Sequence, residues 1–479
     1  MMNVHVEDQS VPLAVDLDGT LIASDLLWEG VFSLLRKYPY LLFMLPFWLL
    51  AGPARLKCEI ATRIDIDPAL LPYREQVLER LHQEKAKGRK IILATGTPRK
   101  FAEAIAQYLG IFDEVLATEA NHNMTSHRKL KALVDLYGEY GFDYAGNSVH
   151  DIQVFKGARR NIIVAPDRPA RRWYVRNGGE LIGAQRPNFK TIVKMVRAHQ
   201  WSKNVLIAVP IVLSHAYANE SMVLACILAF ISFSAAASAI YILNDFFDLA
   251  LDRQHPTKRD RPFASGVLSM RFGLACAFCL LAISFAITVF LPVEYAFVLV
   301  LYLIMTTAYS FSIKRMLLID VLTLAGLYTV RILAGAAASQ VDISFWLLAF
   351  SIFFFLSLAL VKRYVELRSV TLDPKLRMAG RGYRPEDQEV IMQAGMASAF
   401  AATLVLALYI DSADVRNLYD DPWMVWPVAP IILYITMRIW ILARRDEMYD
   451  DPVVFLLRDW RSQAVIAIGA VLVIIAKFV

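Results

Sequence analysis

The sequence predicts two parts of different fold class: an N-terminal α/β domain with a helical cap, over residues 1–165, and a C-terminal all-α membrane domain of nine transmembrane helices, over residues 201–479. Three observations support this division. Of the 479 residues, 57% are apolar and the mean hydropathy is +0.45, which is high for a soluble enzyme. The first 200 residues carry the Glu and Lys content of a water-soluble domain. Beyond them, long apolar runs alternate with short polar bridges.

Nine apolar runs follow residue 200, each long enough, or nearly so, to cross a hydrocarbon core of about 30 Å. The first is the weakest because it is short and contains Pro210. The predicted spans are residues 201–217, 221–243, 270–291, 294–312, 317–337, 343–361, 389–410, 424–442 and 462–478.

The positive charges predict the orientation of these spans. The stretch "MMNVHVEDQSVPLAV" has neither the basic start nor the apolar run of a signal peptide, so we expect the N-terminus in the cytoplasm. The bridges after the second, fourth, sixth and eighth spans then face the cytoplasm, and they hold nearly all the loop Lys and Arg. These residues include Lys258, Arg259, Lys314, Arg315, Lys362, Arg363, Arg444 and Arg445. We therefore expect a multi-pass protein of the inner (cytoplasmic) membrane, with its α/β domain and active sites on the cytoplasmic side and its C-terminus outside.

The net charge of +6 fits a protein that lies against an anionic membrane or binds phosphates. Nucleic acid is not an expected partner, because the basic residues are not clustered among aromatic ones. Residues 166–200 form a basic connector, and its stretch "FKTIVKMVRAHQW" predicts an amphipathic helix in the membrane interface, with an ordinary surface helix as the alternative. The Cys-x-x-Cys pair of "ACAFCL" lacks further ligands and is interpreted as packed small side chains.

Two carboxylates follow a predicted strand near the N-terminus. In "PLAVDLDGTLI", Asp16 and Asp18 come at the carboxyl end of the strand, where side chains of a parallel sheet point into the ligand crevice. The pair suits phosphoryl transfer: one carboxylate attacks phosphorus, the other handles the proton of the leaving group, and Mg²⁺ offsets their repulsion. A second apolar strand, in "KIILATGTP", ends in polar residues, among which the hydroxyl of Thr95 can bind a phosphate oxygen. Lys129 follows, and then the strand and turn of "FDYAGNSVHD", which end at Asp151.

This ordered set resembles the haloacid dehalogenase (HAD) superfamily of Rossmann-type α/β domains over residues 10–165. The resemblance implies that Asp16 is the nucleophile, which forms an aspartyl-phosphate, and that Asp18 is the general acid and base. The implied phosphate binders are Thr95 and Lys129, and the implied Mg²⁺ ligands are Asp16, Asp18, Asn147 and Asp151. The family usually has an acidic residue where Asn147 stands; an amide oxygen still binds a cation but adds no charge. A fold retained without catalysis is the alternative.

Residues 24–88 are expected to form the helical cap of this domain. They contain "YPYLLFMLPFWLLAGP", about a dozen apolar residues interrupted by Pro46, which is too short for an easy transmembrane span. The stretch is interpreted either as cap core or as a surface that dips into the membrane.

An acidic stripe follows the second predicted span. In "NDFFDLALD", Asn244, Asp248 and Asp252 recur every four residues with Asp245 beside them, so a helix places all four on one stripe. Carboxylates this close at the end of a membrane helix need a cation, and Mg²⁺ prefers such hard oxygens and keeps sites for diphosphate. The loop "HPTKRDRPFASG" then supplies positive side chains for the same anion: His255, Lys258, Arg259 and Arg261. Ordinary positive-inside charge is the alternative.

The pattern NDxxDxxxD followed by RPxxSG, at the end of the second of nine helices, resembles the UbiA superfamily of membrane transferases over residues 185–479. Most members join a polyprenyl diphosphate to an aromatic acceptor and carry a second aspartate-rich loop after the sixth helix. This chain departs from them, because its loop "LVKRYVELRSVTLDPKLRMAGRGYRPEDQ" is rich in Lys and Arg. Such a loop is better suited to binding a phosphate than to seating more Mg²⁺.

The stretches "RAHQWSKNVLI" and "HPTKRDRP" add a resemblance to the branch that moves 5-phosphoribosyl from phosphoribosyl diphosphate (PRPP) to polyprenyl (decaprenyl) phosphate. It implies that Mg²⁺ held by Asp245, Asp248 and Asp252 draws charge onto the departing diphosphate while the lipid phosphate attacks C1 of the ribose. The residues expected to bind substrate are Lys203, Asn204, Asn244, His255, Lys258, Arg259, Arg261, Tyr309, Ser310, Lys314, Lys362, Arg363 and Arg377. Asp320 and Arg331 are expected to pair inside the membrane, for structure or for function.

We therefore predict a bifunctional membrane enzyme that transfers 5-phosphoribosyl to polyprenyl phosphate and removes the 5-phosphate in its HAD domain, giving polyprenylphosphoryl ribose. The fusion of the two domains motivates the second step. Three alternatives stay open. They are an aromatic prenyltransferase using polyprenyl diphosphate, beside a HAD domain of regulatory or unrelated role; a membrane-tethered scaffold with a degenerate HAD domain; and a transporter, which the one-sided charge distribution disfavours. Neither the prenyl length nor the oligomeric state follows from the sequence.

Overall fold

The computed structural model describes residues 11–120, 122–183, 187–372, 382–412, 415, 422–448 and 452–478. The chain forms two compact units. The first unit comprises Met1–Val196 together with Tyr241–Ala277, and the second comprises Arg197–Ile240 together with Phe278–Val479. The segment that carries the acidic stripe therefore clusters with the N-terminal domain.

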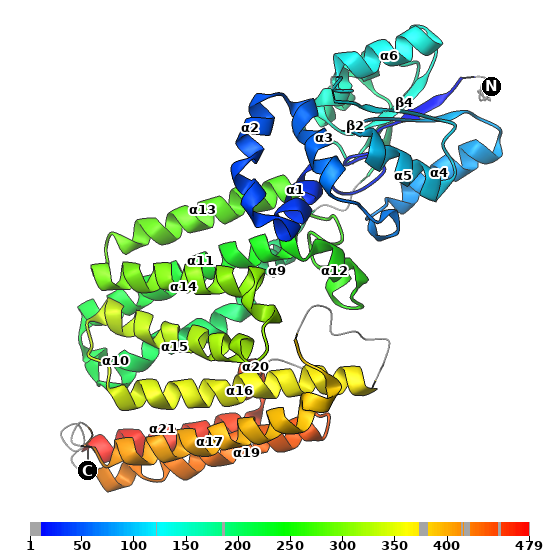
Figure 1. Ribbon diagram of the computed structural model, residues 1–479. Coiled ribbons are helices and arrows are strands. Elements are labelled where there is room, and N and C mark those ends of the chain that lie inside the picture. The colour runs from blue at the N-terminus through cyan, green and yellow to red at the C-terminus, as the bar shows by residue number, and fades with distance from the viewer. Residues whose placement is uncertain are drawn as a thin grey trace, which may run out of the picture. The chain divides into compact units, whose positions relative to one another are not determined.

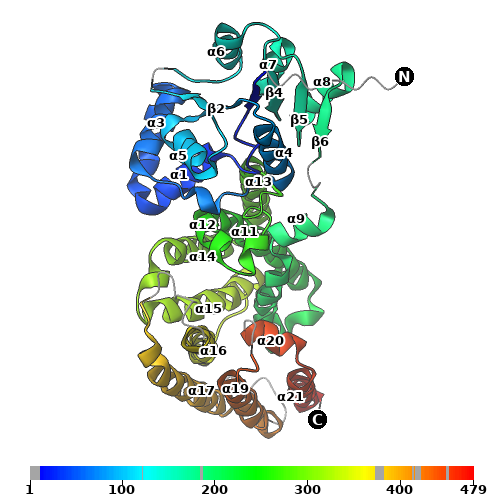
Figure 2. The same cartoon turned by 90° about the vertical axis from the view of Figure 1, so that its right-hand side faces the viewer.

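The first unit is built on a parallel sheet of six strands in the order β3-β2-β1-β4-β5-β6 (Figure 1, Figure 2). The strands are β1 Leu13–Val15, β2 Ile91–Pro98, β3 Glu114–Thr118, β4 Asp143–Gly146, β5 Asn161–Val164 and β6 Glu180–Ile182. β1 pairs with β2 on one side and with β4 on the other, so the strand order reverses at β1. The carboxyl end of β1 is therefore the position at which such sheets bind ligands. The predicted α/β class is confirmed.

Both faces of this sheet are covered by apolar side chains. Leu13 and Val15 of β1 belong to one core cluster and Ala14 to another, because neighbouring side chains of a strand point to opposite faces. The helices that accompany the sheet are α4 Glu75–Ala86, α5 Arg99–Leu109, α6 His127–Tyr137, α7 Ile152–Gly157 and α8 Arg168–Asn177. A sheet covered on both faces leaves the ends of its strands as the place for a site.

A helical cap lies between β1 and β2. It consists of α1 Leu26–Lys37, the 3₁₀ helix η1 Pro39–Phe43, α2 Leu45–Leu50, α3 Pro53–Arg63 and the 3₁₀ helix η2 Pro68–Leu70. α1 begins after Asp25, whose carboxylate accepts a 3.1 Å hydrogen bond from the N–H of Leu27. Gly52, at φ +116°, and Pro53 in the first turn of α3 separate that helix from α2.

The segment Tyr241–Ala277 packs on this cap. It holds the end of α11 Glu220–Phe247, then α12 Leu249–Gln254, the 3₁₀ helix η6 Lys258–Asp260 and the first turns of α13 Met270–Thr288. The ring of Phe32 in α1 lies 4.9 Å from that of Phe246 and 5.2 Å from that of Phe247. Gly266, at φ +72°, lies so close to the cap that an added Cβ would be 2.5 Å from the carbonyl oxygen of Ala23.

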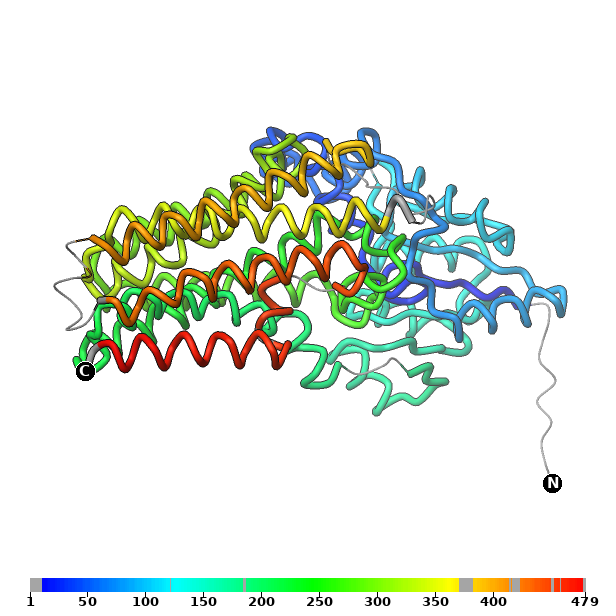
Figure 3. Tube along the Cα trace, turned by 90° about the horizontal axis from the view of Figure 1, so that it is seen from below, coloured from blue at the N-terminus to red at the C-terminus, as the bar shows by residue number. Residues whose placement is uncertain are grey.

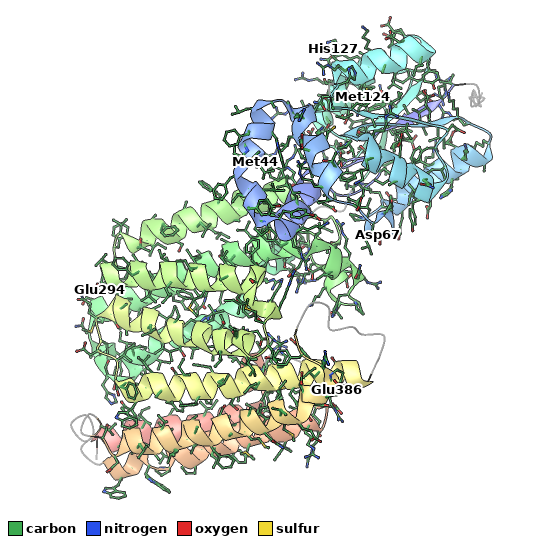
Figure 4. The ribbon with its side chains drawn as sticks, viewed as in Figure 1. Met44, Asp67, Met124, His127, Glu294 and Glu386 are labelled. Carbon is green, nitrogen blue, oxygen red and sulfur yellow. The ribbon has the colours of Figure 1, made fainter. Side chains whose placement is uncertain are left out.

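The second unit is helical. Its elements are the 3₁₀ helix η4 Ala198–Ala208, α10 Val209–Leu213, η5 Ala216–Ala218, α14 Val293–Phe311, η7 Ile313–Arg315, α15 Ile319–Ser339, α16 Phe345–Leu372, η8 Pro385–Asp387, α17 Gln388–Ile410, η9 Pro422–Val425, α19 Val428–Arg444, α20 Pro452–Arg458 and α21 Trp460–Phe478. α16, α17, α19 and α21 run side by side (Figure 3). Glu294, at the start of α14, and Glu386, before α17, mark opposite ends of the helical unit (Figure 4).

Seven helices in the described part of the chain are long and apolar enough to cross a membrane, so the protein is a multi-pass membrane protein. They are Glu220–Phe247, Met270–Thr288, Val293–Phe311, Ile319–Ser339, Phe345–Ser369, Pro385–Ile410 and Trp423–Arg444. The apolar helix Trp460–Ala476 is shorter. The membrane helical class is thus confirmed, whereas the count of nine helices is not.

Two predicted helices are broken or shortened in the structure. The first predicted span, 201–217, is broken into η4, α10 and η5, because buried polar side chains of η4 bind neighbouring helices and Pro210 opens α10. The amphipathic helix predicted over residues 189–201 ends early: α9 covers Phe189–Met195, and Arg197 adopts a left-handed backbone at φ +50°. Only its first two turns are α-helical.

Candidate active sites

A cavity of about 1190 Å³ opens at the carboxyl end of β1 within the first unit. Asp16, Asp18 and Lys129 line it together with Asn147 and Asp151, so the fold brings the predicted HAD residues together. The cap contributes Leu27, Pro53 and Lys57, and the segment Tyr241–Ala277 contributes Ser265, Gly266, Val267, Leu268, Ser269, Met270 and Arg271. The wall of the cavity is therefore shared by the sheet, the cap and the segment that follows the acidic stripe.

Lys129 lies at the centre of a buried polar cluster. Its ammonium donates to Asp16 Oδ1 at 2.8 Å, to the Tyr144 hydroxyl oxygen at 2.8 Å and to Asp151 Oδ1 at 3.2 Å. The Tyr144 hydroxyl donates to the same Asp151 oxygen at 2.5 Å. Burial alone lowers the pKa of Lys129, but attraction to Asp16 and Asp151 outweighs it, so the pKa lies above its usual value. The ammonium stays charged and is placed to bind the oxygens of a phosphate group.

Asp18 is held at the entrance of the cap. Its Oδ1 accepts from the N–H of Leu26 at 2.8 Å, and its Oδ2 accepts from the Thr97 hydroxyl at 2.6 Å. Burial, with the nearby charge of Asp25, raises the pKa of Asp18 to about 7. Burial also raises the pKa of Asp16, to about 6, against the attraction of Lys129. A carboxyl group with a pKa near neutrality is suited to donate and to accept a proton at that pH.

Asp151 is positioned by the turn in which it lies. Its Oδ2 accepts from the N–H of Asn147 at 3.1 Å, the N–H of Ser148 at 3.0 Å and the hydroxyl of Ser148 at 2.9 Å. Burial disfavours the charged form of Asp151 and raises its pKa. The attraction of Lys129 and the hydrogen bonds from Ser148 have a larger effect, so the pKa of Asp151 lies below its usual value. Asp151 therefore remains an anion beside Lys129.

Asn147 is the one HAD position that departs from the usual acidic residue, and its environment fits a cation. Its Oδ1 is buried and has no hydrogen-bond partner among the described residues. Its Nδ2 packs so tightly on Gly19, at φ +76°, that an added Cβ there would lie 2.1 Å away. Because a buried oxygen without a donor is costly, a Mg²⁺ ion at this place would satisfy it.

Thr97 and Lys57 line the cavity although they were not predicted, whereas the predicted Thr95 lies behind it. Thr95 is fully buried, and its hydroxyl oxygen accepts from the N–H of Thr97 at 3.1 Å, so Thr97 and not Thr95 lines the cavity. Lys57 of α3 reaches across the cavity and donates to the carbonyl of Gly96 at 2.6 Å. Burial lowers its pKa, against the attraction of Asp18. No sequence signal pointed to Lys57, because its contact with Gly96 joins residues 39 positions apart.

The acidic stripe keeps its helical spacing although α11 ends at Phe247. Hydrogen bonds run from the N–H of Asp248 to the carbonyl of Asn244 at 2.9 Å and from the N–H of Asp252 to the carbonyl of Asp248 at 2.8 Å. Asp245 and Asp252 are buried, and the guanidinium of Arg261 donates to both, at 3.2 and 2.6 Å. Burial raises the pKa of Asp252, although Arg261 lowers it. Arg261 thus lies between the carboxylates that were expected to hold Mg²⁺.

The loop after the stripe is more exposed. Lys258 and Arg259 are exposed in η6, and Nδ1 of the half-buried His255 faces the N–H groups of Thr257 and Lys258 at 3.3 and 3.4 Å. Burial and the charges of Lys258 and Arg261 lower the pKa of His255. The imidazole is therefore mostly neutral near pH 7 and can accept these bonds. The exposed Lys258 and Arg259 are available to an anion.

Ion pairs join this segment to the cap. Arg253 donates two parallel hydrogen bonds to Glu29, at 2.9 and 2.7 Å, and a third to the carbonyl of Ala264 at 3.0 Å. Arg36 donates to the carbonyl of Phe247 at 2.8 Å and pairs with Asp248 at 3.4 Å. Arg271 pairs with Asp25 at 2.7 Å. These contacts position residues 265–271 as a wall of the phosphatase-like cavity.

In the second unit, Lys203 and Asn204 lie buried in η4. Asn204 donates to Ser234 of α11 at 2.9 Å and accepts from Nε of Arg331 at 2.9 Å. The Arg331 guanidinium lies 5.3–5.5 Å from the ring centres of Phe233, Tyr302 and Tyr328. The ammonium of Lys203 lies 5.6 Å from the ring centre of Tyr328. η4 and α15 thus place the cationic side chains of Lys203 and Arg331 against one cluster of aromatic rings.

The expected pair of Asp320 and Arg331 is wrong. Asp320 instead binds the guanidinium of Arg363 and accepts from the Tyr383 hydroxyl at 2.5 Å. Both charged side chains of that pair are fully buried, and Arg363 also binds Glu366. The physical reason is distance: Asp320 and Arg331 are eleven residues apart on one helix, α15, which is about 16 Å along its axis.

The other predicted substrate binders of the second unit differ in their burial. Tyr309 and Ser310, in the last turn of α14, Lys314 in η7 and Lys362 in α16 are partly buried. Arg363 is fully buried and used by Asp320, so it is not open to a phosphate in this arrangement. Arg377 lies outside the described residues.

Among the described residues, no group of three or more His, Cys, Asp or Glu side chains is arranged to hold a metal ion. In both sites a cationic side chain separates the carboxylates: Lys129 lies between Asp16 and Asp151, and Arg261 between Asp245 and Asp252. A bound metal would require these cations to shift, and the oxygen donors present are of the kind that Mg²⁺ prefers.

Comparison with known proteins assigns both parts. Residues 205–458 match the model of the UbiA prenyltransferase family, which is more than half of the chain. The chain belongs to the UbiA family. Residues 13–156 match the haloacid dehalogenase-like hydrolases, so this UbiA protein carries an N-terminal HAD domain. The predicted resemblance to both families is confirmed.

Two relatives and one solved structure are similar to this UbiA protein. The uncharacterized protein y4nM of Sinorhizobium fredii is 37% identical over 98% of this chain and 92% of its own length. The decaprenyl-phosphate phosphoribosyltransferase of Corynebacterium glutamicum is 32% identical over 51% of this chain and 74% of its own length. A UbiA homologue from Archaeoglobus fulgidus, solved with GPP and Mg²⁺, is 14% identical, with a TM-score of 0.47 over 60% of this chain and 100% of that chain.

Proposed function

We propose that the UbiA domain transfers 5-phosphoribosyl from PRPP to a polyprenyl phosphate such as decaprenyl phosphate. The observation that carries this proposal is the 32% identity to a decaprenyl-phosphate phosphoribosyltransferase over 74% of that enzyme. The segment after α16 supports it, because it is rich in Lys and Arg where a prenyl diphosphate enzyme of this family has a second aspartate-rich loop.

In the proposed transfer, a bond forms between a phosphate oxygen of the lipid and C1 of the ribose, while the bond from C1 to the diphosphate oxygen breaks. Arg261, Lys258 and Arg259 bind the diphosphate and stabilise its charge as it leaves. Asp245, Asp248 and Asp252, with Asn244, would hold Mg²⁺, which would neutralise the charge of the diphosphate as a Lewis acid. Lys203 is the proposed contact for a phosphate of either substrate, and Arg331 positions Asn204 beside it. Tyr309, Lys314 and Lys362 remain proposed contacts.

The HAD domain is proposed to hydrolyse the 5-phosphate of the lipid product. Asp16 attacks phosphorus, and protonated Asp18 gives its proton to the departing 5-hydroxyl oxygen. Asp18 then takes a proton from the water that hydrolyses the aspartyl-phosphate. Lys129, with Thr97 beside the buried Thr95, holds the phosphate oxygens, and Asp16, Asp18, Asn147 and Asp151 are the proposed Mg²⁺ donors. The phosphatase step, irreversible in practice, draws the reversible transfer forward.

The proposed location is the inner membrane, with the HAD domain and both sites on the cytoplasmic side and the C-terminus outside. The Lys and Arg of the even-numbered bridges support this orientation. PRPP is a cytoplasmic, charged donor that does not cross the bilayer unaided, so the transferase site has to open on that side.

The transferase proposal is tested with purified protein in vesicles that contain polyprenyl phosphate, with Mg²⁺ and labelled PRPP. Label is expected to move into the lipid, and Asp245→Asn is expected to lower the rate at least about tenfold because a carboxylate donor is lost. Turnover of a polyprenyl diphosphate with an aromatic acid, and none of PRPP, would instead establish the aromatic prenyltransferase.

A further inference from the structure

The cap carries a continuous apolar surface that the described part of the chain leaves exposed. It is formed by η1 and α2, whose position is marked by Met44 (Figure 4). We call it the apolar cap face. Its residues are Tyr40, Leu42, Phe43, Met44, Phe47, Leu49 and Leu50, which are between 41% and 85% exposed. Seven large apolar side chains are thus exposed within eleven positions, and exposed apolar patches of this kind mark sites of interaction with a partner or a membrane.

The same segment is also apolar on its inner side. Leu41, Leu45 and Trp48, spaced as one face of a helix, pack against the core of the α/β domain. A cap helix in water would have polar residues on its other face. Here no charged residue occurs from position 38 to position 54, whereas Arg36 and Lys37 precede the segment and Arg55 and Lys57 follow it. An apolar stretch bordered by basic residues is the pattern of interfacial membrane segments.

The cap is attached to the end of a membrane span. α11 is a candidate span that ends at Phe247, and Arg36 of α1 donates to the carbonyl of that residue. Phe32 of α1 packs on Phe246 and Phe247. Pro39, the first residue of η1, follows Arg36 by three residues, which is at most about 11 Å of chain. The apolar cap face therefore begins close to the point where the chain leaves the bilayer.

We propose that the apolar cap face lies in the boundary between headgroups and acyl chains of the bilayer that holds this protein's own spans. The flanking basic residues then meet anionic headgroups. Pro53 and Lys57 line the catalytic cavity and follow Leu50 by three and seven residues. The cavity is thus presented to phosphate esters carried by lipids in that surface, a consequence that rests on the proposed phosphatase function.

Site-specific photocrosslinking tests the position of this face. The photoreactive residue p-benzoylphenylalanine replaces Phe43, which is 76% exposed, in the full chain reconstituted into vesicles of phosphatidylcholine and phosphatidylglycerol. The matched control replaces Tyr140, a 58% exposed aromatic residue beyond α6. Mass spectrometry is expected to find phospholipid adducts at position 43 and none at position 140. Absence of lipid adducts at position 43, or crosslinks there to a second copy of the chain, would overturn the proposal.

A second variant tests the consequence for substrate. Phe43→Ser, Phe47→Ser and Leu50→Ser are combined, which changes only outward side chains. Hydrolysis of a soluble phosphate ester is expected to stay within about twofold, whereas hydrolysis of a phosphate ester on a vesicle lipid falls about tenfold. Equal rates of the variant and the parent on the lipid would contradict the substrate assignment. A parent protein inactive on both esters would refute the phosphatase function, and the crosslinking result would still decide the membrane contact.

Discussion

The buried ion pair of Arg253 and Glu29 tests whether the acidic segment is a structural part of the HAD domain. Arg253→Met keeps the aliphatic bulk and removes the charge. Glu29 then loses donors at 2.9 and 2.7 Å, and the carbonyl of Ala264 loses one at 3.0 Å. The two side chains are only 7% and 10% exposed, so water replaces these bonds poorly.

The expected cost follows from this geometry. Removing one partner of a buried ion pair costs about 3–5 kcal/mol, because the remaining charge is uncompensated. Two lost charged hydrogen bonds at about 1.5–3 kcal/mol each give about 3–6 kcal/mol, which overlaps that range. We therefore expect Arg253→Met to lower the free energy of unfolding of the first unit by about 4 kcal/mol. At about 2–4 °C per kcal/mol for a unit of this size, Tm falls by roughly 8–16 °C.

The assay is a double-mutant cycle of Arg253→Met and Glu29→Met, with thermal unfolding followed in detergent. Arg55→Met on α3 is the control, because its pair with Glu59 is on the surface and is expected to change stability by less than about 1 kcal/mol. The two buried substitutions are expected to be strongly non-additive, since the second removes a charge that the first has already left unpaired. Effects that add within about 0.5 kcal/mol would refute the contact and with it the shared wall of the cavity.

Three further predictions concern the two sites. Asn147→Asp replaces the unpaired amide oxygen of Asn147 with a charged carboxylate, so the Mg²⁺ concentration for half-maximal phosphatase activity should fall. An unchanged concentration would show that Asn147 is not part of the metal site. The pKa of Asp18 is about 7 in the fold against its usual 3.8, so the fold retains a proton that the unfolded chain releases. Stability of the metal-free protein therefore falls as pH rises from about 4 to 7, and Asp18→Asn should flatten Tm measured at pH 5 and 8; equal slopes would contradict this. Gly335→Ala places a Cβ 1.9 Å from the carbonyl oxygen of Ile207 and should impair transfer but not phosphatase activity. The control Gly326→Ala places a Cβ 3.1 Å from a flexible Met side chain and should be tolerated. Equal effects of the two substitutions on transfer would refute the packing of η4 on α15.

Local sequence patterns predicted the HAD cavity well. Asp16 and Asp18 directly follow a buried strand, and parallel strands bring their carboxyl ends to one edge, so the approach of Lys129 and Asp151 follows from topology. Lys57 could not be predicted, because it reaches the cavity through the folding of the cap. Thr95 was predicted as the phosphate binder, but β2 continues to Pro98 and its Thr97 lines the cavity instead.

In the membrane domain, sequence patterns did not predict the ends of two helices or the contacts between helices. The sixth span was expected to end at residue 361, but α16 continues to Leu372, so Arg363 is a buried helical residue and not a loop residue. Its partner Asp320 comes from another helix, and sequence spacing carries no information on such a contact. The first predicted span failed for a different reason: Lys203 and Asn204 use their polar groups inside the protein, which shortens the apolar run. The acidic stripe kept its predicted spacing, since that depends only on local helical hydrogen bonds.

The mass of the lipid product tests the central claim most directly. Full-length protein and the Asp16→Asn variant are incubated with PRPP, polyprenyl phosphate and Mg²⁺, and the lipids are analysed by mass spectrometry. We predict polyprenylphosphoryl ribose from the parent protein and accumulation of its 5-phosphate from Asp16→Asn. Equal accumulation of the 5-phosphate in both would contradict the phosphatase step, and the absence of any ribosylated lipid in both would contradict the transfer itself.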